Sequence, residues 1–524
     1  MSTEAPPEVM PGLMMRTPLL VRSIADRAGL LFGHREVVSA TADGAERSDW
    51  SEVVRRARAL ASSLRELGIR PGDRVATFGW NSRRHMELYL AVPSMGAVLH
   101  TLNIRLFEDD LRYIVAHAED RVIFLDASLA QAMPRFERVE YEILMPDAPT
   151  GRDGALDYED LIARGDESFE FPDVDENSAA AMCYTSGTTG RPKGVVYSHR
   201  STVLHTLLTN QADGAGLRER DTVLPIVPMF HANAWGLPYA AALAGSKLVL
   251  PGPNMDPASL ARLIAEEKVT FAGAVPTIWQ GIAQLDPPAD FSSVERLICG
   301  GSAVPESLMR MYDERFGVPI IQAWGMTETS PMASMSRVPP GGPEGDGAYA
   351  LRATQGRVVP LVDSRIDEDT GGELQVRGPT IAHSYYRDET GAEKFTEDGW
   401  LRTGDVAEML PGAVIKLVDR TKDLVKSGGE WISSVELENE IMAHPDVLEA
   451  AVVAVPSERW GERPCACVVL REGSDLDADG LREFLAPRVA KWWLPERVEF
   501  IDEVPKTSVG KFDKKVLRAR LAQD

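Results

Sequence analysis

Residues 184–195 read Tyr-Thr-Ser-Gly-Thr-Thr-Gly-Arg-Pro-Lys-Gly-Val, and no other stretch says as much about the architecture and chemistry of the chain. Residues 185–190 place four hydroxyl side chains and two glycines in six positions, and Lys193 follows closely. Hydroxyl and backbone N–H groups bind phosphate oxygens, glycine lets the backbone approach them, and lysine adds positive charge. Neither glycine begins the Walker A spacing, and a solvated turn between strands is the alternative. The stretch therefore predicts a phosphate-binding loop of another kind.

The segments around this loop alternate between strand and helix patterns. Strands are expected at residues 179–184 and 194–198, followed by a helix over about 201–211. Further upstream, residues 51–67 carry apolar side chains at helical spacing, and residues 74–80 read as a short buried strand. Residues 87–95 and 97–102 repeat this helix-to-strand order. Such alternation predicts a mostly parallel sheet covered by helices.

The character of the sequence changes in its last third. Short strand-like pieces at 372–377 and 413–418 predict a β-rich subdomain over about residues 351–419. Beyond it we expect helices at 435–444 and 478–489 and strands at 449–455 and 497–501, which form a compact α/β tail. Because 524 residues exceed what one hydrophobic core supports, we expect a large domain over 1–419 and a small one over 420–524.

Composition excludes several classes of protein. With 44% hydrophobic and 26% charged residues, the chain is typical of globular proteins. Its formal net charge of −23 argues against nucleic-acid binding and against strong adhesion to anionic membranes. The four cysteines form no Cys-x-x-Cys motif, the first fifteen residues lack Lys and Arg, and no apolar run reaches about 18 residues. We therefore expect a cytoplasmic protein without a transmembrane segment.

Other short motifs recur at wide intervals along the chain. They are Gly300-Gly-Ser302, Gln322-Ala-Trp-Gly-Met-Thr-Glu328, Trp400-Leu-Arg-Thr-Gly-Asp405, Asp419-Arg-Thr-Lys-Asp423, Lys426-Ser-Gly-Gly-Glu-Trp-Ile-Ser433 and Pro505-Lys-Thr-Ser-Val-Gly-Lys511. Each alone could be turn chemistry or a surface ion pair, but their order and spacing together are not explained in that way. With residues 185–194 they resemble the adenylate-forming superfamily of acyl-CoA synthetases, luciferases and adenylation domains, over about residues 20–520. Residues 228–238 and 426–433 are similar to those of medium- and long-chain fatty acyl-CoA synthetases, and 3-methylthiopropionyl-CoA ligases share much of the pattern.

The resemblance implies a fold and a reaction. The fold is α/β, with mixed and parallel sheets flanked by helices in the large domain and a small, mobile C-terminal α/β domain. In the reaction, ATP activates a carboxylate as an acyl-adenylate with loss of pyrophosphate, and CoA then accepts the acyl group. Lys511 would bridge the carboxylate and the α-phosphate, and Thr185 and Glu328 would hold Mg²⁺, which prefers oxygen ligands. His231 joins Lys511 and Glu328 as a candidate catalytic residue.

The resemblance also assigns the nucleotide contacts residue by residue. Thr185, Ser186, Gly187, Thr188, Thr189, Gly190 and Lys193 would cradle the β- and γ-phosphates, and Thr327 would contact the α-phosphate. Asp405 would accept from the ribose hydroxyls beside Arg420, and Gly301, Gln322, Ala323 and Trp324 would border the nucleotide. Lys422, Lys426 and Trp431 complete the set, with ordinary packing as the alternative for the last two.

The acyl and CoA sides carry the remaining expectations. His231 stands where amino-acid-activating relatives carry an aspartate, which disfavours an amino-acid substrate. Trp235 matches an aromatic gate of the acyl tunnel, with a core tryptophan as the alternative. Small residues such as Gly300 leave room for an alkyl chain, and Gly428 and Gly429 would reach the thioester-forming side when the tail rotates about Lys422. Asp419 replaces the usual glycine of this hinge. We expect a medium- to long-chain fatty acid–CoA ligase and a homodimer. The alternatives are a ligase for a short functionalised or aryl acid and an enzyme that loads a carrier protein.

Overall fold

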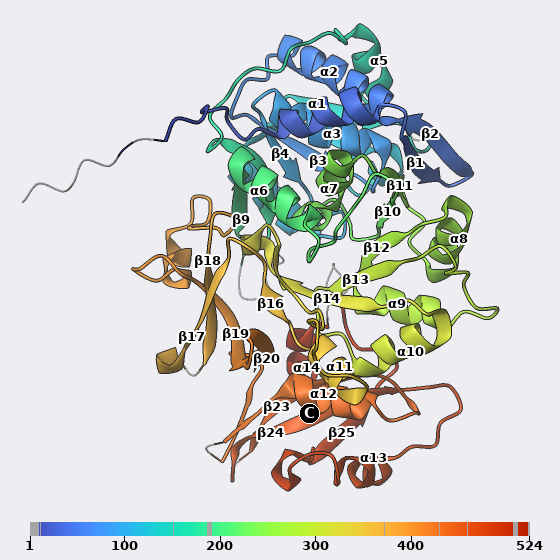
Figure 1. Ribbon diagram of the computed structural model, residues 1–524, viewed down its shortest axis with the longest axis vertical. Coiled ribbons are helices and arrows are strands. Elements are labelled where there is room, and N and C mark those ends of the chain that lie inside the picture. The colour runs from blue at the N-terminus through green and yellow to red at the C-terminus, as the bar shows by residue number, and fades with distance from the viewer. Residues whose placement is uncertain are drawn as a thin grey trace, which may run out of the picture.

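The computed structural model describes residues 10, 12–149, 151–185, 191–370, 372–428, 430–457, 459–506 and 512–521. Its strands form four sheets, of nine, seven, four and five strands (Figure 1). The helices in chain order are α1 (Val21–Phe32), α2 (Trp50–Glu66), α3 (Arg83–Ser94), α4 (Glu108–Ala118), α5 (Tyr158–Arg164), α6 (His199–Asn210), α7 (Leu237–Ala244), α8 (Pro257–Glu267), α9 (Pro276–Ala283), α10 (Glu306–Phe316), α11 (Asp346–Arg352), α12 (Ser434–Met442), α13 (Ala478–Leu485) and α14 (Lys514–Leu521). The α/β fold class expected from the sequence is confirmed.

The nine-stranded sheet is built from strands that are far apart in the sequence. In spatial order it contains β16 (Arg357–Val358), β15 (Met332–Met335), β14 (Ile320–Gly325), β13 (Arg296–Gly300), β12 (Phe271–Ala274), β10 (Thr222–Pro225), β11 (Lys247–Leu250), β1 (Glu36–Thr41) and β2 (Gly44–Asp49). Pairing is parallel from β14 to β1 and antiparallel at both edges. Helices α8, α9 and α10 cover one face and bury Trp279 and Tyr312 in a shared cluster.

The seven-stranded sheet carries the phosphate-loop candidate. Its spatial order is β7 (Leu156–Asp157), β6 (Tyr141–Met145), β5 (Asp120–Asp126), β3 (Arg74–Phe78), β4 (Val98–Thr101), β8 (Ala179–Tyr184) and β9 (Gly194–Ser198). One apolar cluster joins both large sheets through α1, α2, α3, α6 and α7, which therefore lie between them, and α4 covers the other face of this sheet. Helix α2 begins after Asp49, whose carboxylate accepts the Glu52 N–H at 2.8 Å, and its length agrees with the expected helix at 51–67.

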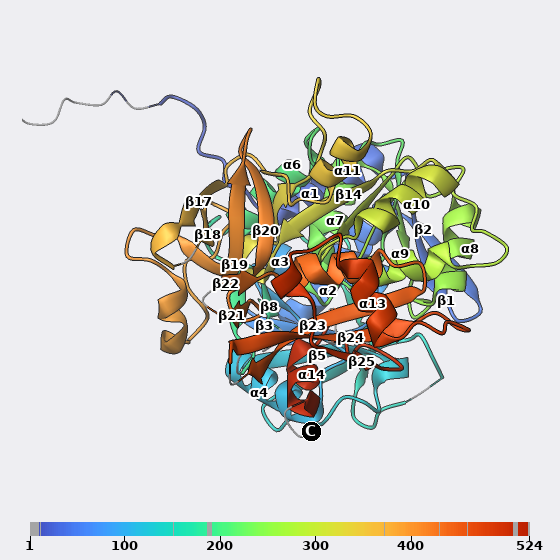
Figure 2. The ribbon, with the colours of Figure 1, turned by 90° about the horizontal axis from the view of Figure 1, so that it is seen from below.

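Two smaller sheets follow. The first contains β17 (Asp363–Asp367), β18 (Glu373–Arg377), β19 (Leu401–Leu410) and β20 (Val414–Arg420). The second contains β22 (Glu430–Ile432), β21 (Val425–Ser427), β24 (Gly461–Leu470) and β23 (Val447–Ser457), with β25 (Arg497–Phe500) paired to β24. This last sheet lies with α12, α13 and α14 at the lower end of the molecule, opposite α1–α3 (Figures 1 and 2). The change of sheet between Arg420 and Val425 is where the sequence predicts a boundary.

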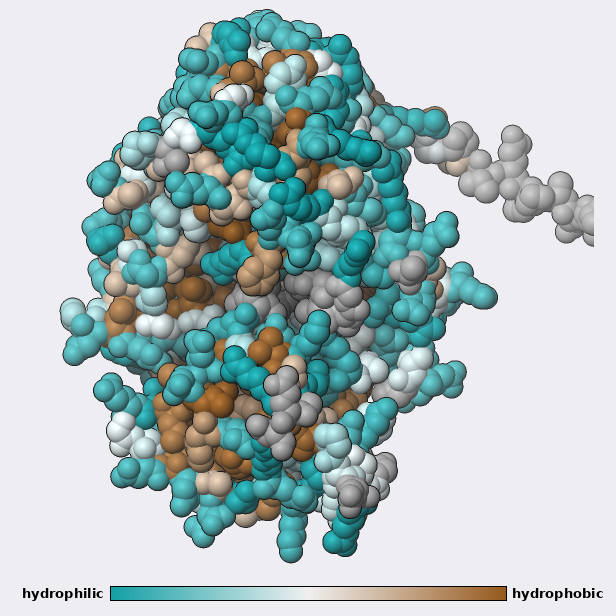
Figure 3. All heavy atoms as spheres, turned by 180° about the vertical axis from the view of Figure 1, so that it is seen from behind, coloured by the Kyte–Doolittle hydropathy of each residue, from teal (hydrophilic) through white to brown (hydrophobic). Residues whose placement is uncertain are grey.

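Four elements of the C-terminal part were not expected from the sequence. They are β21, β22, β24 and α14. Helix α13 also ends at Leu485 rather than near residue 489. Cys465 and Cys467 lie on β24 as buried free thiols. Within the described residues no helix is long and apolar enough to cross a membrane. Seen from behind, polar side chains cover most of the surface, and apolar ones gather in the lower part of the view (Figure 3).

Candidate active site

A cavity of about 1620 Å³ brings the predicted motifs together. Its walls come from the ends of β13 and β14, from β19 and β20, from the loop before α7, and from α12 and the start of α14. The sequence-predicted residues that line it are Thr185, Lys193, His231, Trp235, Gly300, Gly301, Gln322, Ala323, Trp324, Thr327, Glu328, Asp405, Arg420 and Lys422. Residues as far apart in the chain as Thr185 and Lys422 therefore share one space.

Asp405 forms the polar centre of one end of the cavity. Strands β19 and β20 pair so that Asp405 lies opposite Arg420, and the Arg420 Nε is 3.2 Å from Asp405 Oδ1. The Trp324 indole N–H donates to Asp405 Oδ2 at 2.9 Å. The Asp405 side chain is only 7% exposed, and both of its oxygens face a donor, so it is held in a fixed orientation. Such a group suits vicinal hydroxyls, which can donate to both carboxylate oxygens.

Gln322 supports the neighbouring wall. Its amide nitrogen donates to the carbonyl oxygens of Ala353 and Thr354, at 3.1 and 2.9 Å, and its oxygen accepts the Val304 N–H at 2.9 Å. Both amide protons are therefore used within the protein. Gln322 borders the cavity by holding two backbone segments beside it, at Val304 and at 353–354, which the motif alone did not reveal.

Glu328 lies between the nucleotide side and the phosphate-loop side. The Tyr385 hydroxyl donates to Glu328 Oε1 at 2.6 Å, and burial together with the Glu328 charge raises the pKa of Tyr385, so this hydroxyl remains a donor. The Lys193 ammonium lies 5.0 Å from the centre of the Tyr385 ring and 3.1 Å from Asp388 Oδ2. Tyr385 and Asp388 could not be found from the sequence, because no motif or periodic pattern marks the loop that carries them.

Thr185 is the first residue of the predicted phosphate loop. Its N–H donates to the Lys193 carbonyl at 2.9 Å, and its Oγ1 accepts the Lys193 N–H at 3.1 Å, so the two ends of the loop are tied together. The residues Ser186, Gly187, Thr188, Thr189 and Gly190 lie outside the described residues. Thr185 and Glu328 offer a hydroxyl and a carboxylate oxygen to the same cavity, and this donor set fits Mg²⁺ held jointly with phosphate oxygens. No group of three or more His, Cys, Asp or Glu side chains suited to a metal occurs within the part of the chain that is described.

A strained turn places Trp235 on the apolar side of the cavity. Ala232, Asn233, Ala234 and Trp235 have φ values between 42° and 57°, and Gly236 continues the left-handed turn at 73°. Each non-glycine residue in this region costs about 1 kcal/mol or more, so contacts must hold the turn. The Ala234 N–H donates to the His231 carbonyl, and the buried Cys183 thiol donates to Asn233 Oδ1 at 3.3 Å.

The turn brings the Trp235 ring to Gly300. A Cβ added at Gly300 would lie 3.5 Å from Trp235 Cη2 and 2.6 Å from the Ala323 carbonyl oxygen. Only glycine therefore fits between this ring and β14. The cavity is also lined by Thr209, Leu237, Ile298 and Met332, none of which stood out in the sequence.

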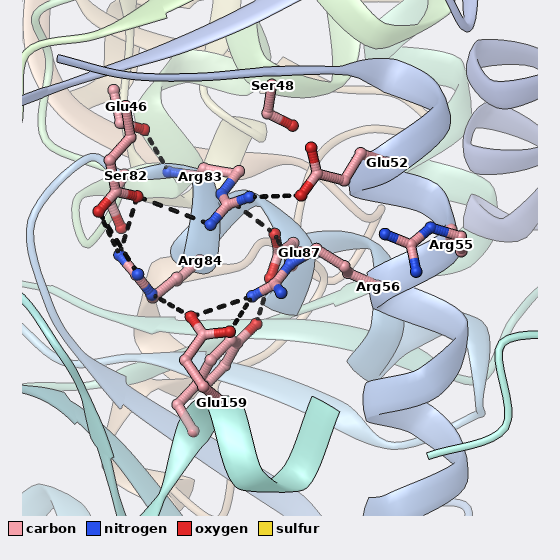
Figure 4. Close-up of polar contacts among 12 residues, drawn as sticks. Glu46, Ser48, Glu52, Arg55, Arg56, Ser82, Arg83, Arg84, Glu87 and Glu159 are labelled. Atoms are coloured by element: carbon pink, nitrogen blue, oxygen red, sulfur yellow. Dashed lines mark hydrogen bonds and ion pairs between the residues drawn. The ribbon is translucent and has the colours of Figure 1, made fainter. Parts of the chain in front are cut away.

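The segment that leads to His231 is held by hydrogen bonds from Asn81. Just before α3, the Asn81 amide donates to the carbonyls of Pro225 and Val227, both at 2.9 Å, and its oxygen accepts the Met229 N–H. The first turn of α3 is in turn fixed by ion pairs (Figure 4). The carboxylates of Glu46, Glu52, Glu87 and Glu159 face the guanidinium groups of Arg56, Arg83 and Arg84. This network positions the wall of the acyl side without facing the cavity.

Three predicted residues do not line the cavity in this arrangement. Lys426 and Trp431 lie on the β21–β22 hairpin, where the Lys426 ammonium is 4.7 Å from the centre of the Trp431 ring. The Gly428 N–H donates to the Trp460 carbonyl. The packing of Lys426 against Trp431 agrees with ordinary packing, which is the alternative that the sequence left open for these two residues.

Gly429 and Lys511 lie outside the described residues. Lys506 and Phe512 form a β-bridge, and Phe512 lines the cavity.

The link between the last two sheets contains a cluster of buried charges. Asp419 accepts the Arg420 N–H at 2.7 Å and the Ser434 N–H at 2.5 Å, so it caps the start of α12. Lys514 lies 2.6 Å from Glu438 Oε1. Burial alone would lower the pKa of Lys514, but the charges of Glu438, Asp419 and Asp423 outweigh it and raise that pKa. Asp419 thus has a role that glycine could not fill. Burial lowers the pKa of the neighbouring Lys422.

Comparison with known proteins agrees with this site. Residues 28–386 match the family described as AMP-binding enzyme, and residues 436–511 match the AMP-binding enzyme C-terminal domain. The chain belongs to the AMP-binding enzyme family. The family and the acid–thiol ligase class that the motifs predict are thus confirmed.

Individual relatives are similar over almost their whole length. The medium-chain-fatty-acid–CoA ligase of Ectopseudomonas oleovorans is 43% identical, with 98% of this chain and 97% of that protein covered. The 3-methylmercaptopropionyl-CoA ligase of Ruegeria lacuscaerulensis is also 43% identical, with 97% and 98% covered. Among solved structures, ATP-bound MatB from Rhodopseudomonas palustris has a TM-score of 0.82 at 27% identity and covers 95% of this chain and 98% of its own.

Proposed function

We propose that this protein is a fatty acid–CoA ligase that uses ATP to form acyl-CoA, AMP and pyrophosphate. The observation that carries the proposal is the single cavity that joins two chemically different ends. The Asp405, Trp324 and Arg420 end offers a fixed carboxylate for ribose hydroxyls, and the Trp235 end offers an apolar path for an alkyl chain. A medium- to long-chain acid is the substrate class that we assign.

In the first half-reaction a carboxylate oxygen of the acid attacks the α-phosphorus of ATP, and the bond to pyrophosphate breaks. Negative charge accumulates on α-phosphate oxygens, where a fixed cation is worth several kcal/mol. We assign this cation to Lys511, which directly precedes Phe512 in the sequence; Phe512 lines the cavity. Residues 185–190 and Lys193 would hold the β- and γ-phosphates, and Thr327 would contact the α-phosphate.

Thr185 and Glu328 would hold Mg²⁺, which neutralises phosphate charge when it is bound. The Tyr385 hydroxyl would fix the Glu328 carboxylate for this role, because it already occupies Oε1.

In the second half-reaction the CoA thiolate attacks the acyl carbon, and AMP leaves with the carboxylate oxygen. Residues 420–524 would rotate about Lys422 between the two steps, withdrawing Lys511 and bringing Gly428 and Gly429 to the site. Asp419 precedes Lys422 in the sequence and Ser434 follows it. The hydrogen bond from the Ser434 N–H to Asp419 would therefore change in this rotation. The domain boundary near residue 420 is part of this proposal.

His231 lies at the cavity wall, where its ring would face the carboxylate end of the acid. A histidine has no negative charge that could pair with the ammonium group of an amino acid. This supports an acid without an α-amino group. The similarity to a 3-methylmercaptopropionyl-CoA ligase makes a short thioether acid the second candidate substrate.

A coupled assay of AMP release tests the proposal directly. Purified protein is incubated with ATP and Mg²⁺, with and without CoA, over C2–C18 fatty acids, aryl acids, 3-methylthiopropionate and amino acids. We expect CoA-dependent turnover with a maximum among the C6–C16 acids. A maximum at 3-methylthiopropionate or an aryl acid would select the alternative substrate, and turnover with amino acids would overturn the assignment.

Two further expectations rest on the sequence alone. We propose a homodimer formed through the large domain, which light scattering of the eluting peak in size-exclusion chromatography tests. The cytoplasmic location remains a prediction from the sequence.

A further inference from the structure

His100 and Asp120 form a buried pair that none of the steps above uses. Both side chains are fully buried, and His100 Nδ1 lies 2.9 Å from each oxygen of Asp120. A carboxylate placed in this way holds the imidazole proton on Nδ1, and Nε2 then becomes a hydrogen-bond acceptor. The pair therefore fixes one tautomer of His100.

The acceptor atom of this pair, His100 Nε2, makes no hydrogen bond to the described residues. His100 Nε2 is buried without a hydrogen-bond partner among the residues that the structure describes. An unsatisfied buried polar atom calls for an explanation, because pairing is the rule in protein interiors. Since Nδ1 faces Asp120, Nε2 lies on the other side of the ring.

The His100 ring lines a small cavity directly behind the active site. This cavity has a volume of about 10 Å³, and its other walls include Asn103, Thr185, Phe230 and His231. Such a volume corresponds to about one water molecule. Thr185 and His231 also line the large cavity, so they separate the small cavity from the nucleotide and acyl sides.

The Thr185 hydroxyl needs an acceptor for its proton. Its oxygen has two lone pairs, and one of them already accepts the Lys193 N–H at 3.1 Å. The second lone pair can face the nucleotide side only if the hydroxyl proton points elsewhere. In the small cavity, the unpartnered His100 Nε2 is an acceptor that this proton can reach without turning toward the nucleotide.

We propose that one water molecule in the small cavity accepts the Thr185 proton and donates to His100 Nε2. Asp120 and His100 are then positioning residues that orient the Thr185 hydroxyl toward bound nucleotide. The inference rests on the proposed function only in that Thr185 contacts ATP; it does not depend on which acid is activated.

Two substitutions at His100 separate this role from simple packing. His100→Gln places an amide near the position of Nε2, whereas His100→Asn places one near Nδ1 and keeps only the contact with Asp120. We expect His100→Asn to weaken ATP binding, measured by calorimetry with Mg²⁺, by about three- to tenfold, as expected for one lost hydrogen bond. His100→Gln should stay within about twofold of the original chain. A structural role limited to Asp120 predicts the reverse order and would overturn the proposal.

The chain offers a matched control in His199. This histidine is equally buried, its Nδ1 accepts the Val21 N–H at 3.3 Å, and its Nε2 also lacks a partner in the described part of the chain. It lines neither cavity, so His199→Asn should leave ATP affinity unchanged. An equal loss in this control would show that any buried histidine matters in the same way, which contradicts the proposal.

A crystal structure of the unaltered protein with ATP provides a test that does not depend on the folding of any variant. We expect one ordered water within hydrogen-bond distance of His100 Nε2 and Thr185 Oγ1. A small cavity without water, or a Thr185 hydroxyl bonded elsewhere, would refute the relay. The AMP-release assay is read separately, so a failure of the ligase assignment remains distinguishable from a failure of the relay.

Discussion

Replacement of Asp405 by asparagine tests the nucleotide end of the cavity. The substitution keeps the size of the side chain and one oxygen that can accept the Trp324 N–H, now at 2.9 Å. It removes the charge that faces Arg420 and that would accept from the ribose hydroxyls. Hydrogen bonds to a charged acceptor are worth about 1.5–3 kcal/mol each, so the loss of one predicts a KM for ATP about 10- to 150-fold higher.

Protein stability should change much less than ATP binding. The Arg420 side chain is 47% exposed, so water screens its ion pair with Asp405, and such pairs contribute at most about 1 kcal/mol. Steady-state kinetics with saturating acid and CoA gives the KM, and scanning calorimetry gives the stability. Asp398→Asn is the control, because Asp398 pairs with exposed Arg365 in the same β-rich region and lies outside the cavity wall. An unchanged KM for ATP together with a clearly lower Tm would show that Asp405 is only structural.

Three other perturbations address the acyl end, the catalytic carboxylate and a buried acid. Trp235→Ala should shift kcat/KM toward longer acids, since each methylene newly buried contributes about 0.8 kcal/mol, or roughly fourfold; an identical chain-length profile would exclude the gate. Glu328→Gln should lower the rate of pyrophosphate exchange about 100-fold or more. Tyr385→Phe should lower it by about tenfold at most, because it removes only one hydrogen bond to Glu328. Equal losses in the two variants would contradict the supporting role of Tyr385. Burial raises the pKa of Asp126 to about 8, so the folded chain holds a proton there that the unfolded chain releases above about pH 4. The unfolding free energy should therefore fall by up to about 1.4 kcal/mol per pH unit between pH 4 and 8, and Asp126→Asn should remove this slope; parallel profiles for the two proteins would refute it.

The sequence predicted those parts of the fold that local patterns determine. The strands at 179–184 and 194–198 occur as β8 and β9 with the expected bounds, because apolar strand patterns flank an obvious loop. It did not predict that β1 and β2 would join the nine-stranded sheet through β11, about 200 residues away, since pairing of distant strands leaves no local mark. The helix α14 was missed because its charged sequence shows little apolar periodicity.

In the candidate site too, residues within motifs were predicted, and residues that act through tertiary contacts were not. Motif residues such as Asp405 and Glu328 line the cavity as predicted. The left-handed turn at residues 232–236 could not be foreseen, because alanine and tryptophan carry no preference for positive φ and tertiary contacts impose the conformation. Tyr385 and the pair of His100 and Asp120 were also invisible, since their roles arise from residues that are distant in sequence.

If this cavity forms an acyl-adenylate from a fatty acid, one oxygen atom passes from the acid to the nucleotide. A fatty acid labelled with ¹⁸O in its carboxylate is turned over with ATP, Mg²⁺ and CoA, and the products are examined by mass spectrometry. We expect one ¹⁸O atom in AMP and none in pyrophosphate, because AMP leaves with the carboxylate oxygen. Label in inorganic phosphate, with ADP as the nucleotide product, would contradict it.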